Sequence, residues 1–175
     1  MAGHSKWAKL KHQKGKTDAQ RSAMFSKLVR FISVEAKKTK GDRSAPGLRA
    51  AIDKARAANM PAENIDRAIE KASSSGELEL VVYEAYGPGG VALIIEAYTD
   101  SRNRTAQEIK HLLSTHGVEL ATPGAASWAF AKNAEGKLEP TTTVEVNEED
   151  GEKLSELIDK LEDNNDVNEV HTNAA

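Results

Sequence analysis

The apolar residues of this chain change their spacing once, and the change divides the sequence into two kinds of structure. As far as Ala72 they recur every three or four residues, as they do along one face of a helix. After the stretch Ser73-Ser74-Ser75-Gly76 they alternate with polar residues, which is typical of strands that bury one face. The sequence therefore predicts an α+β fold, with a three-helix domain over residues 17–72 and a mixed domain over residues 77–175.

Three helices are predicted before the linker. Thr17 and Gln20 have the spacing of a capping box, and the apolar stripe that follows them continues to a left-handed stop at Gly41. A second helix is predicted over residues 48–59 and a third over residues 62–72. Together they bury one shared apolar face.

The second domain is predicted to be ferredoxin-like. Its elements are strands over residues 78–86 and 91–98, a helix over 105–116, strands over 127–132 and 142–146, a helix around 154–161 and a strand over 167–172. From residue 91 onward this order is β-α-β-β-α-β, the split βαβ pattern. The strand over residues 78–86 then counts as one extra strand.

The charges of the chain are separated along the sequence. Residues 1–56 hold 15 Lys and Arg against 4 Asp and Glu, a net charge of +11, and residues 57–175 hold 9 against 23, a net charge of −14. Such asymmetry indicates a polyanionic partner at the basic end. The alternative is that the two parts attract each other across a domain boundary.

Residues 1–16 hold five lysines and no acid, and we interpret them as a basic arm. Lysine and arginine bind nucleic acid by neutralising phosphates and releasing counterions. The candidate contacts are His4, Lys6, Trp7, Lys9, Lys11, His12, Lys14 and Lys16 in the arm, Arg21, Lys27 and Arg30 on the first helix, and Arg102 and Arg104 before the helix at residue 105. Trp7 either stacks on an unpaired base or pins the arm to the helices. The alternative for the last two arginines is an ordinary solvated loop.

The sequence offers little for catalysis or metal binding. The absence of cysteine excludes disulfides and thiol chemistry and indicates a reducing compartment, the cytoplasm. His111 and His116 lack the i, i+4 spacing of a helical zinc site, and His171 suits titration or phosphate contact better than ligation. The glycines of residues 87–90 lack the lysine of a phosphate-binding loop. We therefore predict no enzyme activity, no cofactor, no metal and no small-molecule substrate.

No apolar run is long enough to span a membrane, so no membrane partner is expected. The acid-free opening has one alternative interpretation, an organelle transit peptide, but it lacks an apolar helical face.

Short motifs are spread over nearly the whole chain. They are MAGHSKW at residues 1–7, KHQK at 11–14, FSKL at 25–28, LRAAIDKA at 48–55, NMP at 59–61, YGPGGV at 86–91, TDSRNRT at 99–105 and TTVEVNEED at 142–150. Together these motifs closely resemble the YebC/PmpR family. The resemblance implies a cytoplasmic or organellar regulatory protein. Some family members bind DNA as transcriptional regulators, and others act in translation on the ribosome, including at proline-rich stretches. When the family's binding residues are transferred to the matching positions, the resemblance implies that the nucleic-acid surface lies on the arm and the first helix.

One departure from the family concerns the second half of the chain. Typical members carry a further α/β domain between the strand that ends near Lys132 and the strand that begins at Thr142. Here residues 133–141 alone join these two positions. The resemblance therefore implies a short form of the family that lacks the third domain.

Three functions are compatible with these features of the sequence. The first is binding of ribosomal RNA or the ribosome, which modulates translation, by a protein that we expect to be a monomer. The second is DNA binding in transcription, in which the helices over 48–59 and 62–72 imitate a helix-turn-helix and Asn64, Arg67 and Lys71 read bases. The third is a protein-interaction module whose working surface is the acidic second domain.

Overall fold

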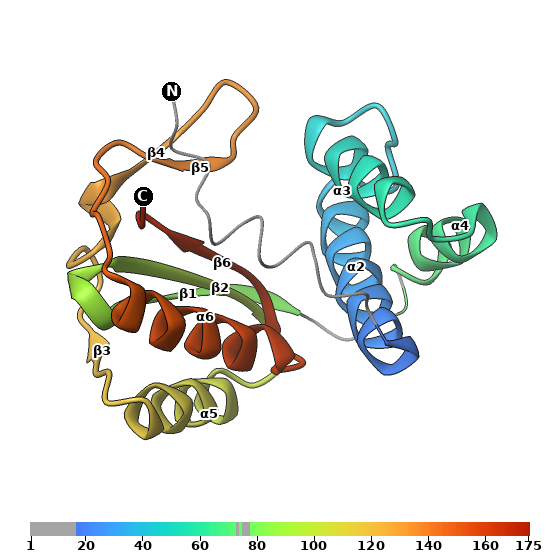
Figure 1. Ribbon diagram of the computed structural model, residues 1–175. Coiled ribbons are helices and arrows are strands. Elements are labelled where there is room, and N and C mark those ends of the chain that lie inside the picture. Colours follow the sequence, from blue (N-terminus) through green and yellow to red (C-terminus); the bar gives the residue numbers. More distant parts are fainter. Residues whose placement is uncertain (1–16, 73, 75–77) are drawn as a thin grey trace. The chain divides into compact units, whose positions relative to one another are not determined.

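The computed structural model describes residues 17–72, 74 and 78–175 (Figure 1). The predicted basic arm over residues 1–16 lies outside the described residues. The chain separates into two compact units, one of helices and one built on a β-sheet, and each is described by itself.

The helical unit contains the three predicted helices, α2 (Asp18–Lys38), α3 (Pro46–Ala57) and α4 (Ala62–Lys71). The capping box at the start of α2 is confirmed, because the Gln20 N–H donates to the Thr17 hydroxyl and the Thr17 N–H donates to the Gln20 side chain at 2.9 Å. The predicted left-handed stop is also confirmed, since Gly41 has φ +80° and its N–H donates to Ala36 O.

The core of the helical unit is small and rich in alanine. Its buried residues are Leu28, Ile32 and Ala36 of α2, Leu48, Ala51, Ile52 and Ala55 of α3, Met60, and Ile65, Ala68 and Ala72 in and beside α4. Alanine at the contacts lets helix axes approach closely, so this core fixes the backbones of the three helices. No charged residue of the described helical unit is fully buried.

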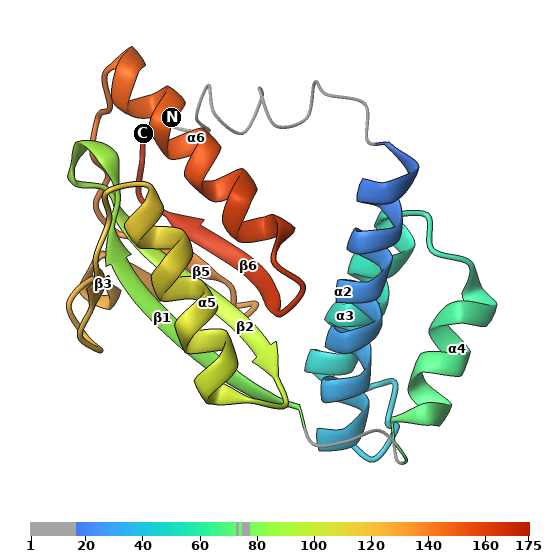
Figure 2. The same cartoon turned by 90° about the horizontal axis from the view of Figure 1, so that it is seen from below.

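The second unit is built on a four-stranded sheet with the order β3-β1-β2-β6. Its strands are β1 (Glu79–Tyr86), β2 (Ala92–Thr99), β3 (Leu120–Ala121) and β6 (Val167–Thr172). A short turn, η1 (Pro88–Gly90), joins β1 to β2. The helices α5 (Arg102–Thr115) and α6 (Glu148–Asp163) cover one face (Figure 2), where their leucines and isoleucine pack on Leu93 and Ile95.

The other face of the sheet carries a smaller apolar cluster. Ala92 and Ile94 pack there against Ala126, Ala129 and Phe130. These last residues lie in and beside η2 (Ser127–Ala129) and β4 (Phe130–Lys132), which pairs with β5 (Leu138–Pro140) in a separate two-stranded sheet.

The α+β class is confirmed, but two strand predictions are wrong. Of the predicted strand over residues 127–132, Phe130–Lys132 is a strand, and it lies outside the main sheet. Residues 142–146 form no strand, and Val144 makes one isolated bridge to Ala174. The reason is that β1, held beside β2 by the η1 turn, fills the inner position that a ferredoxin-like sheet gives to its third strand. β1 is therefore part of the four-stranded arrangement and is not an extra strand.

Among the helices that the structure describes, none has both the length and the apolar character needed to cross a lipid bilayer.

Candidate nucleic-acid interface

The separation of charge along the sequence coincides with the two units. Residues 17–72 hold 12 Lys and Arg against 7 Asp and Glu, a net charge of +5. Residues 78–175 hold 7 against 19, a net charge of −12. The helical unit is therefore the part of the described chain that attracts a polyanion, and the sheet unit repels one.

Some cations of the helical unit are bound to its own carboxylates. The pairs are Lys38–Glu35 at 2.8 Å, Arg43–Asp66 at 2.7 Å, Arg56–Asp53 at 3.8 Å and Arg67–Glu63 at 3.0 Å. The cations of these pairs are about half exposed or more, and exposed pairs contribute at most ~1 kcal/mol. A phosphate can therefore compete for these four cations.

Five other cations of the helical unit are exposed and have no carboxylate at ion-pair distance within the described ranges. They are Arg21, Lys37, Lys40, Arg49 and Lys71. These groups meet the condition that the nucleic-acid hypothesis requires, which is outward-facing charge that the protein has not already neutralised.

The three cations predicted on the first helix do not form one patch. Arg21 is exposed, whereas Lys27 and Arg30 are half-buried. At about 100° per residue, Arg30 lies roughly 60° around the helix from Lys27 and roughly 180° from Arg21. The contacts predicted for these residues stay predictions, and any shared ligand has to reach around α2.

Arg104 has a structural role at the start of α5. Its guanidinium donates to the Asp166 carboxylate at 2.9 Å, and the Thr105 hydroxyl donates to the same carboxylate at 2.7 Å. The side chain of Asp166 is 5% exposed. Arg104 thus compensates the negative charge of a buried carboxylate and links α5 to the turn before β6. The exposed Arg102 lies in the same helical turn, and its predicted contact with nucleic acid stays a prediction.

Replacing Arg104 with alanine is expected to lower the free energy of unfolding by about 1–3 kcal/mol, because a buried carboxylate loses a charged donor. The affinity for nucleic acid is expected to stay the same. Loss of a phosphate contact would instead lower affinity roughly five- to eightfold at about 0.1 M salt. Chemical denaturation and a binding titration, with Arg102→Ala as the matched control, distinguish the two roles.

The structure reveals an exposed aromatic residue for which the sequence gives no functional signal. Trp128 in η2 is 62% exposed, and its indole N–H donates to the Tyr86 hydroxyl at 2.8 Å and to Ala125 O at 3.0 Å. The Tyr86 hydroxyl donates to the same carbonyl. The ring is therefore held in one orientation with a face open to solvent, a geometry that suits stacking on a base.

The segment before Trp128 is held by a buried acid. The carboxylate of Glu84, on β1, accepts hydrogen bonds from the N–H groups of Gly124, Ala126 and Ser127 at 2.7–2.9 Å. Burial raises the pKa of Glu84, but these backbone donors outweigh it and hold the pKa below its usual range. The sequence shows Glu84 as an ordinary polar residue of an alternating strand, so it gave no signal for this role.

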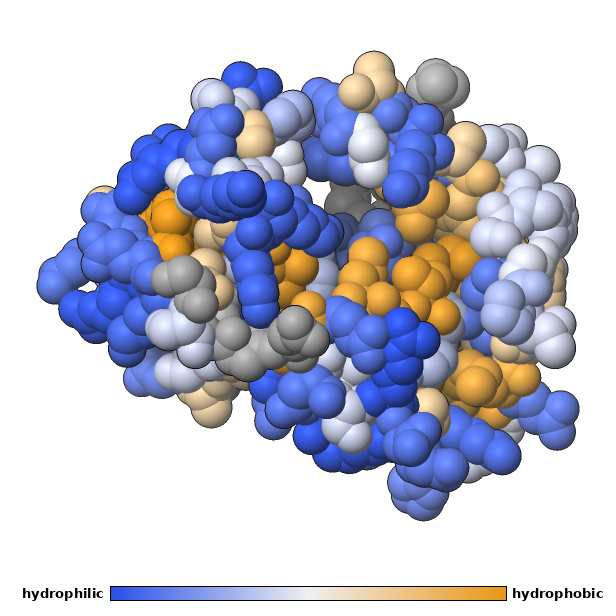
Figure 3. Space-filling model, turned by 180° about the vertical axis from the view of Figure 1, so that it is seen from behind, coloured by the Kyte–Doolittle hydropathy of each residue, from blue (hydrophilic) through white to orange (hydrophobic). Residues whose placement is uncertain are grey.

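Apolar side chains also reach the surface of the protein among hydrophilic ones (Figure 3). The exposed large hydrophobic residues of the described chain are Leu80, Val82 and Tyr86 on β1, Leu120 on β3 and Trp128 in η2. Leu80, Val82 and Tyr86 alternate along β1 and share its face with Glu84.

The fold and the charges define an α+β protein with a cationic helical unit and an acidic sheet unit. Residues 5–75 match the TACO1/YebC protein N-terminal domain, and residues 78–135 and 131–174 match the TACO1/YebC second and third domain. The chain belongs to the TACO1/YebC family, which confirms the resemblance found in the sequence.

Individual relatives agree with this assignment. A protein of Petrotoga mobilis is 43% identical over 98% of this chain and 70% of its own length, and one of Thermotoga maritima is 38% identical over 99% and 93%. Both are named "Probable transcriptional regulatory protein". The crystal structure of a conserved hypothetical protein from Aquifex aeolicus has a TM-score of 0.82 and 32% identity, and covers 98% of this chain and 97% of that one.

The longer alignments bear on the predicted missing domain. The alignment to the Thermotoga maritima relative spans 238 positions, whereas this chain has 175 residues, so that relative carries segments absent here. The two stretches that match the second and third domain overlap at residues 131–135, in the β4–β5 hairpin. This is the place where the sequence predicts that a domain is missing.

Proposed function

We propose that this chain is a non-enzymatic regulatory protein of the cytoplasm that binds nucleic acid through its cationic N-terminal third. The observation that carries the proposal is the separation of charge into a helical unit of net charge +5 and a sheet unit of −12. Counterion release makes a surface with several unneutralised cations a binder of phosphate backbones. The names of the relatives, which describe regulators, support the same class.

Within this class we propose RNA or the ribosome as the partner, with modulation of translation, including at proline-rich stretches, as the outcome. The argument comes from α4, the helix that would read bases if α3 and α4 acted as a helix-turn-helix. Its Arg67 is paired with Glu63, and its Asp66 is paired with Arg43. Three acids against two bases give α4 a net charge of −1, which opposes entry into a groove lined by phosphates.

Exposure of Trp128 also favours a partner with unpaired bases, since stacking requires a free base face. DNA binding in transcription is the alternative, and the names of the relatives support it. If the protein binds neither nucleic acid, a protein-interaction role for the acidic unit takes its place.

Crosslinking in cells followed by sequencing of the attached nucleic acid tests the proposal. Ribosomal RNA is the expected product, and recovery of promoter DNA alone would replace translation with transcription. A variant with Lys9, Lys11 and Lys14 changed to glutamate serves as the control, because its recovery should fall to background for either partner.

A further inference from the structure

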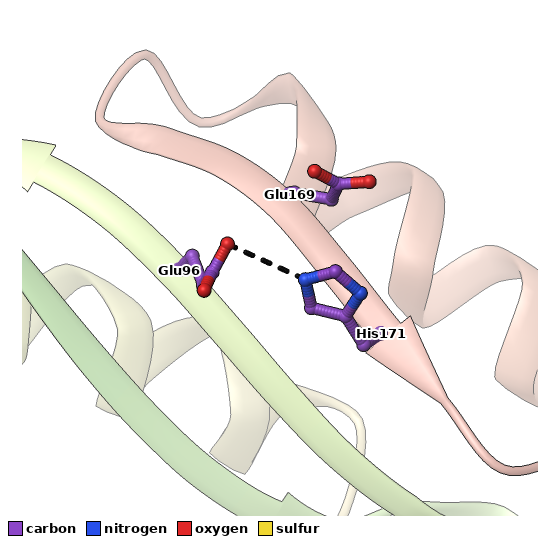
Figure 4. A group of neighbouring side chains, drawn as sticks. All are labelled: Glu96, Glu169 and His171. Atoms are coloured by element: carbon purple, nitrogen blue, oxygen red, sulfur yellow. Dashed lines mark hydrogen bonds and ion pairs between the residues drawn. The ribbon is translucent and has the colours of Figure 1, made fainter. Parts of the chain in front are cut away.

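Three side chains on the sheet form a cluster that the proposed function does not use. Glu96 on β2 lies directly opposite Glu169 on β6 in the antiparallel register. His171 is two residues beyond Glu169, so it projects from the same face of the sheet. The imidazole lies beside the Glu96 carboxylate, and Glu169 lies on the same strand as His171, nearer the beginning of that strand (Figure 4).

The three side chains of this cluster are partly buried, and each offers a ligand atom for a metal ion. The side chains of Glu96 and His171 are 24% and 14% exposed, so water screens them poorly. His171 Nε2 lies 3.3 Å from Glu96 Oε2, and one ligand atom from each of the three residues falls within 4.8 Å of the others.

These atoms approach the spacing of a metal centre. Bonds of about 2.0–2.2 Å place neighbouring ligands roughly 3–4 Å apart, so small side-chain rotations bring the set into range. One imidazole and two carboxylates suit Zn²⁺ or a similar first-row transition ion, whereas Mg²⁺ and Ca²⁺ prefer oxygen ligands alone. Among the described residues this is the one group of its kind.

We propose that Glu96, Glu169 and His171 form a binding site for a divalent transition metal ion of the Zn²⁺ class. Three protein ligands leave a position open, which a water molecule or an exogenous oxygen ligand completes. The sequence alone predicts no metal and favours titration or phosphate contact for His171, because the strand register that brings together two glutamates far apart in the chain is not visible in it.

The test is isothermal titration of the metal-stripped full chain with ZnCl₂. One ion per chain is expected to bind the wild type. His171→Gln and Glu96→Gln are each expected to weaken that binding at least about tenfold, because replacing even a residue that only hydrogen-bonds to a metal ligand lowers metal affinity by about this factor. The control is His111→Gln, an exposed histidine on α5, which should bind like the wild type.

Thermal unfolding provides a second readout that also checks folding. The two near-isosteric variants should melt close to the wild type without metal, and ZnCl₂ should raise the melting temperature of the wild type alone. Absence of binding to the wild type overturns the proposal. Binding that survives both His171→Gln and Glu96→Gln overturns it as well, because the ion then uses other ligands.

Discussion

Changing Lys9, Lys11 and Lys14 to glutamate is expected to lower the affinity for nucleic acid on the order of a hundredfold or more at about 0.1 M salt. The three lysines lie in residues 1–16, so this expectation comes from the sequence and not from described geometry. Each lost phosphate contact removes one event of counterion release. The slope of log affinity against log salt should therefore flatten by about 2 for a single strand or about 3 for a duplex.

The matched control places the same charge change on the sheet unit. Lys110, Lys132 and Lys160 are exposed there, and their reversal alters the net charge by the same amount. This variant should keep most of the affinity and the original salt slope. An equal loss in both variants would show that net charge and not the arm governs binding. A loss confined to one nucleic-acid sequence would instead indicate base reading by the arm.

Replacing Glu84 with alanine is expected to lower the free energy of unfolding by about 2–3 kcal/mol. The substitution removes one acceptor that serves the N–H groups of Gly124, Ala126 and Ser127. Glu84 is 7% exposed, so water cannot fully replace the carboxylate. The fluorescence of Trp128, which follows this segment, should shift as its surroundings become mobile. Chemical denaturation measures the loss of stability.

The charge of Glu84 predicts how its contribution depends on pH. The pKa of Glu84 in the folded protein is below the ordinary value of 4.5, because three backbone donors stabilise the charged form. Its stabilisation is therefore fully present above about pH 4.5 and is lost as the pH falls through the lower folded pKa.

A comparison of the wild type with Glu84→Gln tests this dependence. The difference in unfolding free energy should be large at neutral pH and should shrink as the carboxyl group becomes protonated. A difference that stays constant across the acid range would contradict the charged role of Glu84. The exposed Glu156→Gln variant is the control and should follow the wild type at every pH.

Local signals explain why the helices were predictable and the order of the strands in the sheet was not. The Thr17 capping box, the stop at Gly41 and the apolar stripe between them are all local to α2. Residues close together in the sequence are therefore sufficient to predict this helix. Strand pairing joins distant residues. Residues 142–146 alternate like a strand, yet the position beside β2 already belongs to β1. β3, at two residues, is too short to leave a pattern.

The same distinction applies to the functional residues. The basic character of the N-terminal third follows from composition alone. The roles of Glu84 and Arg104 cannot be inferred from composition, because each depends on a partner far away in the sequence. Glu84 accepts from the Ala126 N–H, and Arg104 donates to Asp166. Likewise, the cluster at His171 exists through the β2–β6 register.

Photocrosslinking of the full chain to bound RNA, followed by mass spectrometry of the modified peptides, tests the central claim most directly. Adducts are expected within residues 1–56, which hold a net charge of +11. Further adducts at Trp128 would add the sheet unit as a stacking contact. Adducts confined to residues 78–175 and absent from the N-terminal third would contradict the account.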